Sequence, residues 1–170
     1  MTIRIVSDST CDLPAAVIRD NHITIVPMYI NIGSKTFRDG IDLSRQEFYE
    51  QLPNYTHHPT TAAPSPGLFR QVYEQLATEG ATEILSIHIS VKLSAVVDMA
   101  AQGAKETSTV PVTVFDSRQL SMGTGFQVLA AAQAAAAGRS MSEIIALLEE
   151  QITRTRTFAA LDTLEFLRRS

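Results

Sequence analysis

Residues 3–14 decide the fold, and they read IRIVSDSTCDLP. The mostly apolar run from Ile3 to Val6 has the length and β-branched character of a buried strand. Polar residues follow it directly, and Pro14 stands where the first turn of a helix is expected, with Asp12 as the candidate cap. A strand that passes through a short polar turn into a helix is the first part of an α/β unit.

The same alternation continues along the chain. Further strands are expected over 23–32, 83–89, 110–115 and 154–160. Helices are expected over 14–21, from Ser44 to about 52, and over 66–79, 94–105, 119–137, 141–151 and 161–169. Because strands alternate with helices, the fold class is α/β, with a mostly parallel sheet flanked by helices and right-handed crossovers.

Two segments depart from this alternation. Pro27 interrupts or redirects the second strand, and Gly33 and Ser34 turn it into a small β-hairpin near residues 28–38. Residues 53–66 contain four prolines, so we expect them to form a loop without regular structure.

Three polar stretches are expected to meet at one edge of the sheet. They are residues 7–14, 60–66 and 89–94, and each leads into a predicted helix. In an open α/β sheet, strand carboxyl ends and helix N-termini converge on one edge, and ligands bind there. Helix N-termini present free N–H groups, so hydroxyl-rich stretches with few Lys or Arg predict a small anionic head group.

Composition excludes several classes of function. The chain has 170 residues and a net charge of −4, and it contains no cluster of basic residues of the kind that contacts nucleic acid or an anionic membrane surface. Its single cysteine, Cys11, forms no intrachain disulfide. The first residues do not have the pattern of a signal peptide, and the longest apolar segment, 128–137, is too short to span a bilayer. We expect a cytoplasmic protein.

Several side chains that could carry chemistry have a simpler structural interpretation. Asp8 is expected to bond loop N–H groups, because an acidic side chain would repel an anionic ligand. Cys11 is expected to be a small buried residue, and His88 to pack within its strand. Adjacent His57 and His58 point apart, which argues against a metal site.

Six motifs, taken in chain order, resemble the DegV family of bacterial fatty-acid-binding proteins. Each motif alone is weak, but six in register are specific. They are residues 8–14, Val26-Pro27-Met28, Phe37-Arg38-Asp39-Gly40, residues 61–66, residues 89–94, and Asp116-Ser117 with Ser121-Met122-Gly123.

The resemblance implies a function. Members of the family are two-domain α/β proteins that hold one long-chain fatty acid, such as palmitate, without catalysis, cofactor or metal. Some present its carboxylate to a fatty-acid kinase. By this resemblance, residues 1–160 are the N-terminal domain, and residues 161–170 begin the connection to a second domain absent from this chain.

The resemblance also assigns residues to the head group. Thr61 and Ser94 match the hydroxyl residues that hold the carboxylate, and Ser9, Ala62, Ser90 and Ala95 surround them. From the residues alone, Ser94 is as well explained as the N-cap of the helix 94–105, and Thr61 as a loop hydroxyl. Five positions depart from the family pattern: Ala95 replaces a glycine, Val96 a threonine, Val97 an aromatic residue, Ala63 a glutamine and Val91 a serine.

If the ligand is a fatty acid, burial of its acyl chain supplies most of the binding affinity. A sixteen-carbon chain buried at about 0.8 kcal/mol per CH₂ gains roughly 10 kcal/mol before entropy losses. The candidate wall residues are Met28, Ile30, Ile32, Phe69, Met99 and Phe126.

Two other functions stay open. A small-molecule transferase-like enzyme domain is one, although the chain has no nucleophile elbow, P-loop or Rossmann glycine pattern. A ligand-free interaction module is the other. A truncated chain is also expected to expose apolar surface, to bind lipid poorly and to form a homodimer.

Overall fold

Four parallel strands form the main sheet of the molecule. The computed structural model describes residues 2–161, 164 and 168. The strand order is β2-β1-β6-β7, which confirms the predicted fold class. The strands are β1 (Ile3–Asp8), β2 (Thr24–Val26), β6 (Glu83–His88) and β7 (Val112–Asp116). The central pair, β1 and β6, places Ile5 opposite Leu85.

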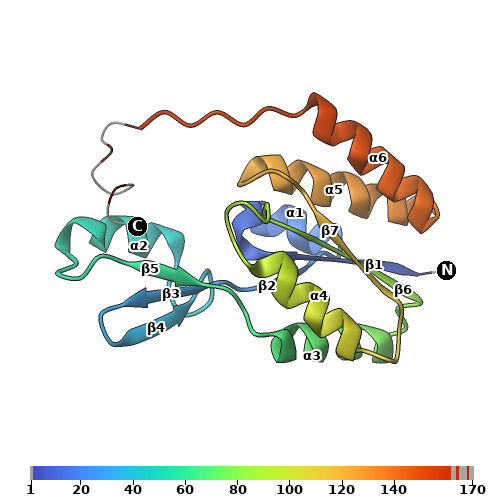
Figure 1. Cartoon of the computed structure of the whole chain (residues 1–170), viewed down its shortest axis with the longest axis horizontal. Coiled ribbons are helices and arrows are strands. Elements are labelled where there is room, and N and C mark those ends of the chain that lie inside the picture. Colours follow the sequence, from blue (N-terminus) through green and yellow to red (C-terminus); the bar gives the residue numbers. More distant parts are fainter. Residues whose placement is uncertain (1, 162–163, 165–167, 169–170) are drawn as a thin grey trace.

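Helices cover both faces of this sheet (Figure 1). One face carries α1 (Ala15–Asp20), α5 (Met122–Ala136) and α6 (Met141–Arg154). The other carries α3 (Pro66–Thr78) and α4 (Val96–Glu106). A single 3-10 turn, η1 (Ser9–Cys11), follows β1 directly.

Alternation along the strands divides the core into two layers. Ile5 belongs to the layer under α5, where Val128 is fully buried. The next residue, Val6, points the other way, toward Phe69 of α3. A parallel sheet covered on both faces needs strands that are apolar in nearly every position, and this is what the run 3–6 provides.

A second, antiparallel sheet lies beside the main one, with the strand order β4-β3-β5. Its strands are β3 (Tyr29–Ile32), β4 (Lys35–Arg38) and β5 (Thr60–Ala62), and α2 (Arg45–Gln51) and η2 (Leu52–Asn54) lie between β4 and β5. We call residues 29–62 the small lobe and the rest of the described chain the main lobe; Figure 1 shows the small lobe at one end of the molecule.

Pro27 marks the boundary between the two sheets. The predicted strand 23–32 divides there, so that β2 joins the main sheet and β3 joins the small lobe. The predicted hairpin is confirmed as β3 and β4. The loop predicted over 53–66 is wrong at β5, because Pro59 and Pro64 flank this strand and leave its three residues free to pair with β3.

Two further predictions are corrected. The strand predicted over 154–160 is wrong, because α6 continues through Arg154 and residues 155–160 have no regular structure. Asp12 does not cap α1; it has a φ of +56° and ends η1, while Pro14 itself is the N-cap of α1. Most of the helix predicted over 161–169 falls outside the described residues.

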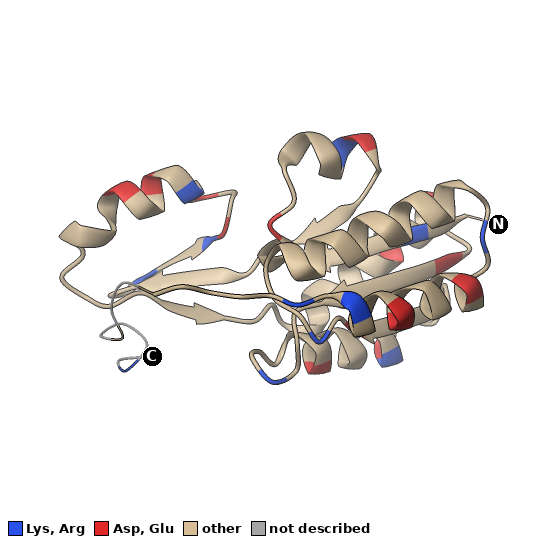
Figure 2. Ribbon diagram, turned by 90° about the horizontal axis from the view of Figure 1, so that it is seen from above, with Lys and Arg blue, Asp and Glu red and all other residues tan. Residues whose placement is uncertain are grey.

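Charged residues lie mainly on helices and loops, with the two signs mixed (Figure 2). Across residues 2–161, 164 and 168, no helix has both the length and the apolar character needed to cross a membrane.

Replacing Gly125 by Ala is expected to lower the free energy of unfolding by about 1–3 kcal/mol, because overpacking in a closely packed site has this cost. A Cβ at this position of α5 would lie only 2.3 Å from the carbonyl oxygen of Cys11 in η1. The midpoint of urea unfolding measures the loss.

Gly67→Ala is the matched control in α3, where a Cβ would lie 3.9 Å from its nearest neighbour, the Ser65 hydroxyl. This change is expected to be neutral or to stabilise by up to about 1 kcal/mol. Equal unfolding midpoints for the two variants would contradict the close approach of α5 to η1.

Candidate ligand-binding site

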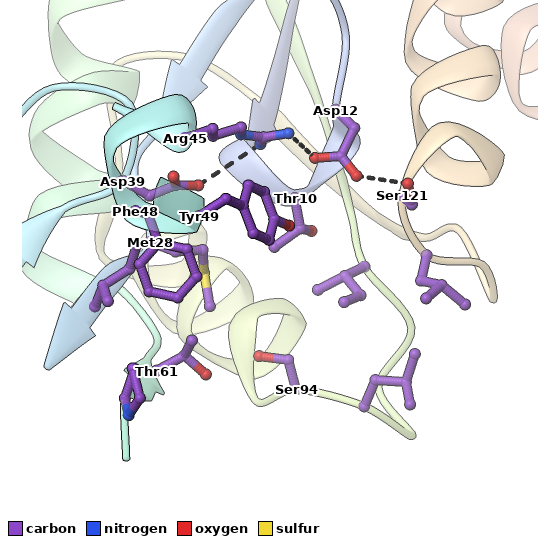
Figure 3. A pocket seen from close by; sticks show the side chains of 15 residues that line it. Thr10, Asp12, Met28, Asp39, Arg45, Phe48, Tyr49, Thr61, Ser94 and Ser121 are labelled. Carbon is purple, nitrogen blue, oxygen red and sulfur yellow. Dashed lines mark hydrogen bonds and ion pairs between the residues drawn. The ribbon is translucent and has the colours of Figure 1, made fainter. Parts of the chain in front are cut away.

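A pocket of about 420 Å³ lies where the carboxyl ends of the main strands meet the small lobe (Figure 3). This volume falls within the range of small-molecule sites, roughly 300–1,000 Å³. The main lobe contributes Thr10, Asp12, Met28, Ile89, Leu93, Ser94, Leu120 and Ser121. The small lobe contributes Ile30, Asp39, Arg45, Phe48, Tyr49, Pro59 and Thr61.

The walls of this pocket are mostly apolar. Met28 and Ile30 come from the segment that joins the two lobes, and both are nearly buried. Phe48 extends from α2, and Leu93 and Leu120 lie in loops that follow main-sheet strands. Such a surface favours a ligand with a substantial hydrocarbon part.

Two hydroxyls predicted from the sequence, Thr61 and Ser94, face this one pocket. Thr61 lies in the middle of β5, paired with Ile30, and Ser94 lies in the turn between β6 and α4. Figure 3 shows the two side chains at the same end of the pocket. Within the part of the chain that the structure describes, neither hydroxyl has a hydrogen-bond partner. Their contact with a ligand stays a prediction.

Ser94 does not cap α4, contrary to the alternative that the sequence left open. The N-cap is Ala95, and its side chain makes no capping hydrogen bond. The Ser94 N–H instead donates to the Ser90 carbonyl at 3.2 Å, which closes the turn one residue before the helix. The Ser94 hydroxyl therefore makes no capping hydrogen bond to the N-terminus of α4.

The other four predicted site residues lie around the pocket and do not line it. The Ser9 hydroxyl is buried and accepts from the Met28 N–H at 3.1 Å. The Ser90 hydroxyl accepts from the Lys92 N–H at 3.3 Å. Both hydroxyls thus hold turns next to the pocket. Ala62 and Ala95 are exposed neighbours of Thr61 and Ser94.

Of the predicted wall residues, Met28 and Ile30 line the pocket. Phe69 is wrong as a wall residue, because it is fully buried in the core under α3. Phe126 is 53% exposed on α5, and Met99 packs against the core from α4. Sequence alone does not distinguish a wall from a core position, because both are apolar.

Arg45 is a pocket residue that sequence reasoning missed. It occupies the first position of α2, and its guanidinium forms an ion pair with Asp12. Its Nη2 donates to the Ser9 carbonyl at 2.6 Å and lies 3.7 Å from the Asp39 carboxylate. Burial lowers the pKa of Arg45, but the hydrogen bond and charge of Asp12 raise it by more, so the net shift is upward.

This charged cluster lies at the opposite end of the pocket from Thr61 (Figure 3). Arg45 carries one positive charge, and Asp12 and Asp39 carry two negative charges, so the cluster is negative overall. An anionic head group is therefore favoured at the hydroxyl end, away from these carboxylates.

Asp8 organises the floor of the pocket from within the core. It is fully buried, and its carboxylate accepts from the Thr10 N–H at 3.0 Å and from the Thr10 hydroxyl. The second oxygen accepts from the Ile89 N–H at 3.3 Å and lies 2.9 Å from Nδ1 of His88. This confirms that Asp8 bonds loop N–H groups, and it places Thr10 and Ile89 in the pocket wall.

A buried chain of hydrogen bonds continues from this carboxylate to α3. Nε2 of His88 lies 2.7 Å from the Ser86 hydroxyl, to which Tyr73 donates at 2.8 Å. Burial raises the pKa of Tyr73 strongly. The Ser86–His88–Asp8 order is that of a hydrolase triad, but all three residues are fully buried, so no substrate reaches Ser86.

The pKa of Asp8 lies below its ordinary value. Burial raises it, but the hydrogen bond and charge of His88 and the bonds from Thr10 lower it by more. Cys11 is buried in the core, which confirms the interpretation of a small buried residue, and this burial raises the pKa of its thiol. The described residues include no group of three or more His, Cys, Asp or Glu side chains placed to hold a metal ion.

Asp8→Asn is expected to cost about 3 kcal/mol of unfolding free energy at pH 7, since it breaks a buried hydrogen-bonded pair. The folded pKa is depressed, so the carboxylate stabilises above its unfolded pKa of about 3.9, and this contribution is lost as the pH falls through the folded value. The difference between wild type and variant should therefore shrink below about pH 4.

Urea unfolding at several pH values measures this difference. Asp20→Asn, on the exposed end of α1, is the control and is expected to change the stability by less than about 0.5 kcal/mol. If the difference in unfolding free energy between wild type and Asp8→Asn stays constant between pH 7 and pH 3, the Asp8 charge does not stabilise the fold.

Comparison with known proteins identifies the family of the chain. The model of the DegV family, whose members it describes as uncharacterised proteins, matches residues 2–170. A DegV domain-containing protein of Deinococcus radiodurans is 39% identical over 168 residues, which are 99% of this chain and 59% of that protein. The chain thus spans less than two thirds of this relative.

Two solved structures share the fold. A DegV family protein of Thermus thermophilus, described as fatty-acid binding, has a TM-score of 0.82 at 36% identity, over 90% of this chain and 54% of that one. DegV of Bacillus subtilis, described as a fatty acid binding protein, has a TM-score of 0.86 at 30% identity, with the same coverage of both chains.

Proposed function

This chain belongs to the DegV family, and we propose that it binds one long-chain fatty acid, such as palmitate, in the pocket between its two lobes. The observation that carries this proposal is a mostly apolar pocket with Thr61 and Ser94 at one end, whose hydroxyls have no hydrogen-bond partner among the described residues. The descriptions of the similar proteins from Thermus thermophilus and Bacillus subtilis as fatty-acid binding support it.

In this proposal the carboxylate accepts hydrogen bonds from Thr61 and Ser94. Bonds to an ionised acceptor are stronger than neutral ones, and they favour the charged form of the carboxyl group without a formal cation. The N-terminus of α4 begins just after Ser94 and adds main-chain N–H groups near Ala95. Arg45 is already paired with Asp12, so it is not the head-group partner.

The acyl chain follows the apolar wall away from the hydroxyls. Met28 and Ile30 form this wall with Phe48 of α2. Burial at about 0.8 kcal/mol per CH₂ makes the tail the main source of affinity, and the head group then fixes the orientation. Ser9 and Ser90 contribute through the turns they hold, and Ala62 through its main chain.

A second domain completes the pocket in the same proposal. Residues 1–160 are the N-terminal domain, and residues 161–170 begin the connection. Leu93 and Leu120 line the pocket but are 58% and 40% exposed, which supports an apolar rim that another surface covers.

We further propose that the protein is a cytoplasmic carrier that presents the carboxylate to a fatty-acid kinase. Acyl phosphate is expected only when the kinase, ATP and the loaded protein are mixed, because the described pocket offers no phosphate-binding glycine loop. Mass spectrometry of the acyl product and an ADP assay measure this. ADP and acyl phosphate formed from the protein, the fatty acid and ATP without the kinase would favour the transferase-like alternative.

Native mass spectrometry of the full-length protein, which includes the proposed second domain, tests the binding itself, because this chain alone is expected to bind lipid poorly. An adduct of fatty-acid mass is expected on the wild type, and its loss is expected after Thr61→Val and Ser94→Ala together. In a fluorescent-fatty-acid titration, the double variant should bind about 10–100-fold more weakly, since two charge-assisted bonds are lost.

Thr60→Val is the matched control for this titration. Thr60 precedes Thr61 on β5, so its side chain points to the opposite face, and it does not line the pocket. Its affinity should equal that of the wild type. If the double variant also binds as tightly as wild type, Thr61 and Ser94 do not hold the head group, and a wild type without any adduct would favour a ligand-free interaction module.

A further inference from the structure

The helix α2 covers one side of the pocket without being part of a core. None of its seven residues is buried, yet Phe48 and Tyr49 line the pocket. A helix of two turns is not stable by itself in water. Contacts outside α2 must therefore hold it in place.

Before α2, the chain is fixed within the small lobe. Leu43 is buried, and the Gly40 N–H donates to its carbonyl at 3.0 Å. Arg38 and Asp42 form a two-pronged ion pair, with bonds of 2.7 and 2.8 Å. These contacts set the start of α2, but they do not connect it to the main lobe.

Arg45 makes that connection. Its guanidinium pairs with Asp12 and donates to the Ser9 carbonyl, both in the segment that follows β1. In the described ranges, no other α2 side chain forms a hydrogen bond or ion pair with the main lobe. Arg45 is thus the polar link between α2 and the main sheet.

Asp12 extends the link to a third segment. Its second oxygen accepts from the Ser121 hydroxyl at 2.5 Å, at the start of α5. Figure 3 shows Arg45, Asp12 and Ser121 in a row above the pocket, with Tyr49 beside them. The row therefore bridges the pocket from the small lobe to α5.

We propose that Arg45 is a positioning residue that clasps α2 to the main lobe, so that release of the Asp12 pair lets Phe48 and Tyr49 move and admits the acyl chain. This inference rests on the proposed fatty-acid binding for its purpose. The clasp itself rests on Arg45, Asp12 and Ser9. The Arg45 side chain is 46% exposed and Asp12 30% exposed, so solvent competes for the pair and the clasp can open.

Arg45→Met tests the clasp, because it keeps the length of the side chain and removes the charge. In the ligand-free protein, hydrogen exchange of residues 45–51 is expected to rise roughly tenfold, while exchange in α5 and α6 stays unchanged. Unchanged exchange in α2 would overturn the inference, and so would a rise spread evenly over α5 and α6.

Stopped-flow binding of a fluorescent fatty acid tests the passage of the ligand. Association and dissociation of the fatty acid should both become faster in Arg45→Met, because a closed clasp slows both entry and exit. The dissociation constant should change less than either rate. Arg45→Lys keeps the positive charge but lacks the forked guanidinium, so its association and dissociation rates should lie between those of wild type and Arg45→Met. Rates equal to those of wild type would refute the role of the clasp in ligand passage.

Arg70→Met is the control, since Arg70 pairs only locally with Glu74 on α3 at 3.6 Å and does not line the pocket. It should change neither exchange in α2 nor the binding rates. If the wild type binds no fatty acid, the proposed function fails, and the hydrogen-exchange result alone decides whether Arg45 clasps α2.

Discussion

Asp8 is fully buried at the end of β1, where its carboxylate accepts bonds from η1 and from the end of β6. A buried carboxylate without such donors costs several kcal/mol, so the two segments are kept at fixed positions relative to each other. Thr10 and Ile89, which line the pocket, belong to these two segments. The floor of the pocket therefore depends on the way the fold satisfies one charge inside its core.

The pocket separates two kinds of polar group. Thr61 and Ser94 form a neutral end whose hydroxyls have no partner in the described part of the chain, whereas Arg45, Asp12 and Asp39 form a charged end whose groups are paired with one another. An anion is repelled by the net negative cluster and finds donors at the neutral end. For the proposed fatty acid, this separation favours one orientation, with the carboxylate at the end formed by Thr61 and Ser94.

How far the sequence predicts this molecule depends on the range of the interaction. Local signals worked: Pro27 divides two strands, and the helix predicted over 141–151 is α6, which begins with a capping box formed by Ser140 and Glu143. The strand β5 could not be predicted from local sequence. It has only three residues, lies between prolines and forms by pairing with β3, about thirty residues earlier in the chain. The ion pair between Arg45 and Asp12 likewise could not be predicted from local sequence, since an Arg in a first helical turn usually faces solvent.

The rim of the pocket also holds backbone strain that bears on affinity. Asp12 and Ser121 both have positive φ, +56° and +51°, although neither is a glycine. Such conformations persist only where surrounding contacts impose them, and here the two residues hydrogen-bond each other while Arg45 holds Asp12. A rim ordered before the ligand arrives does not lose that conformational freedom on binding. For the proposed ligand, more of the free energy gained from burying the acyl chain would then appear as affinity.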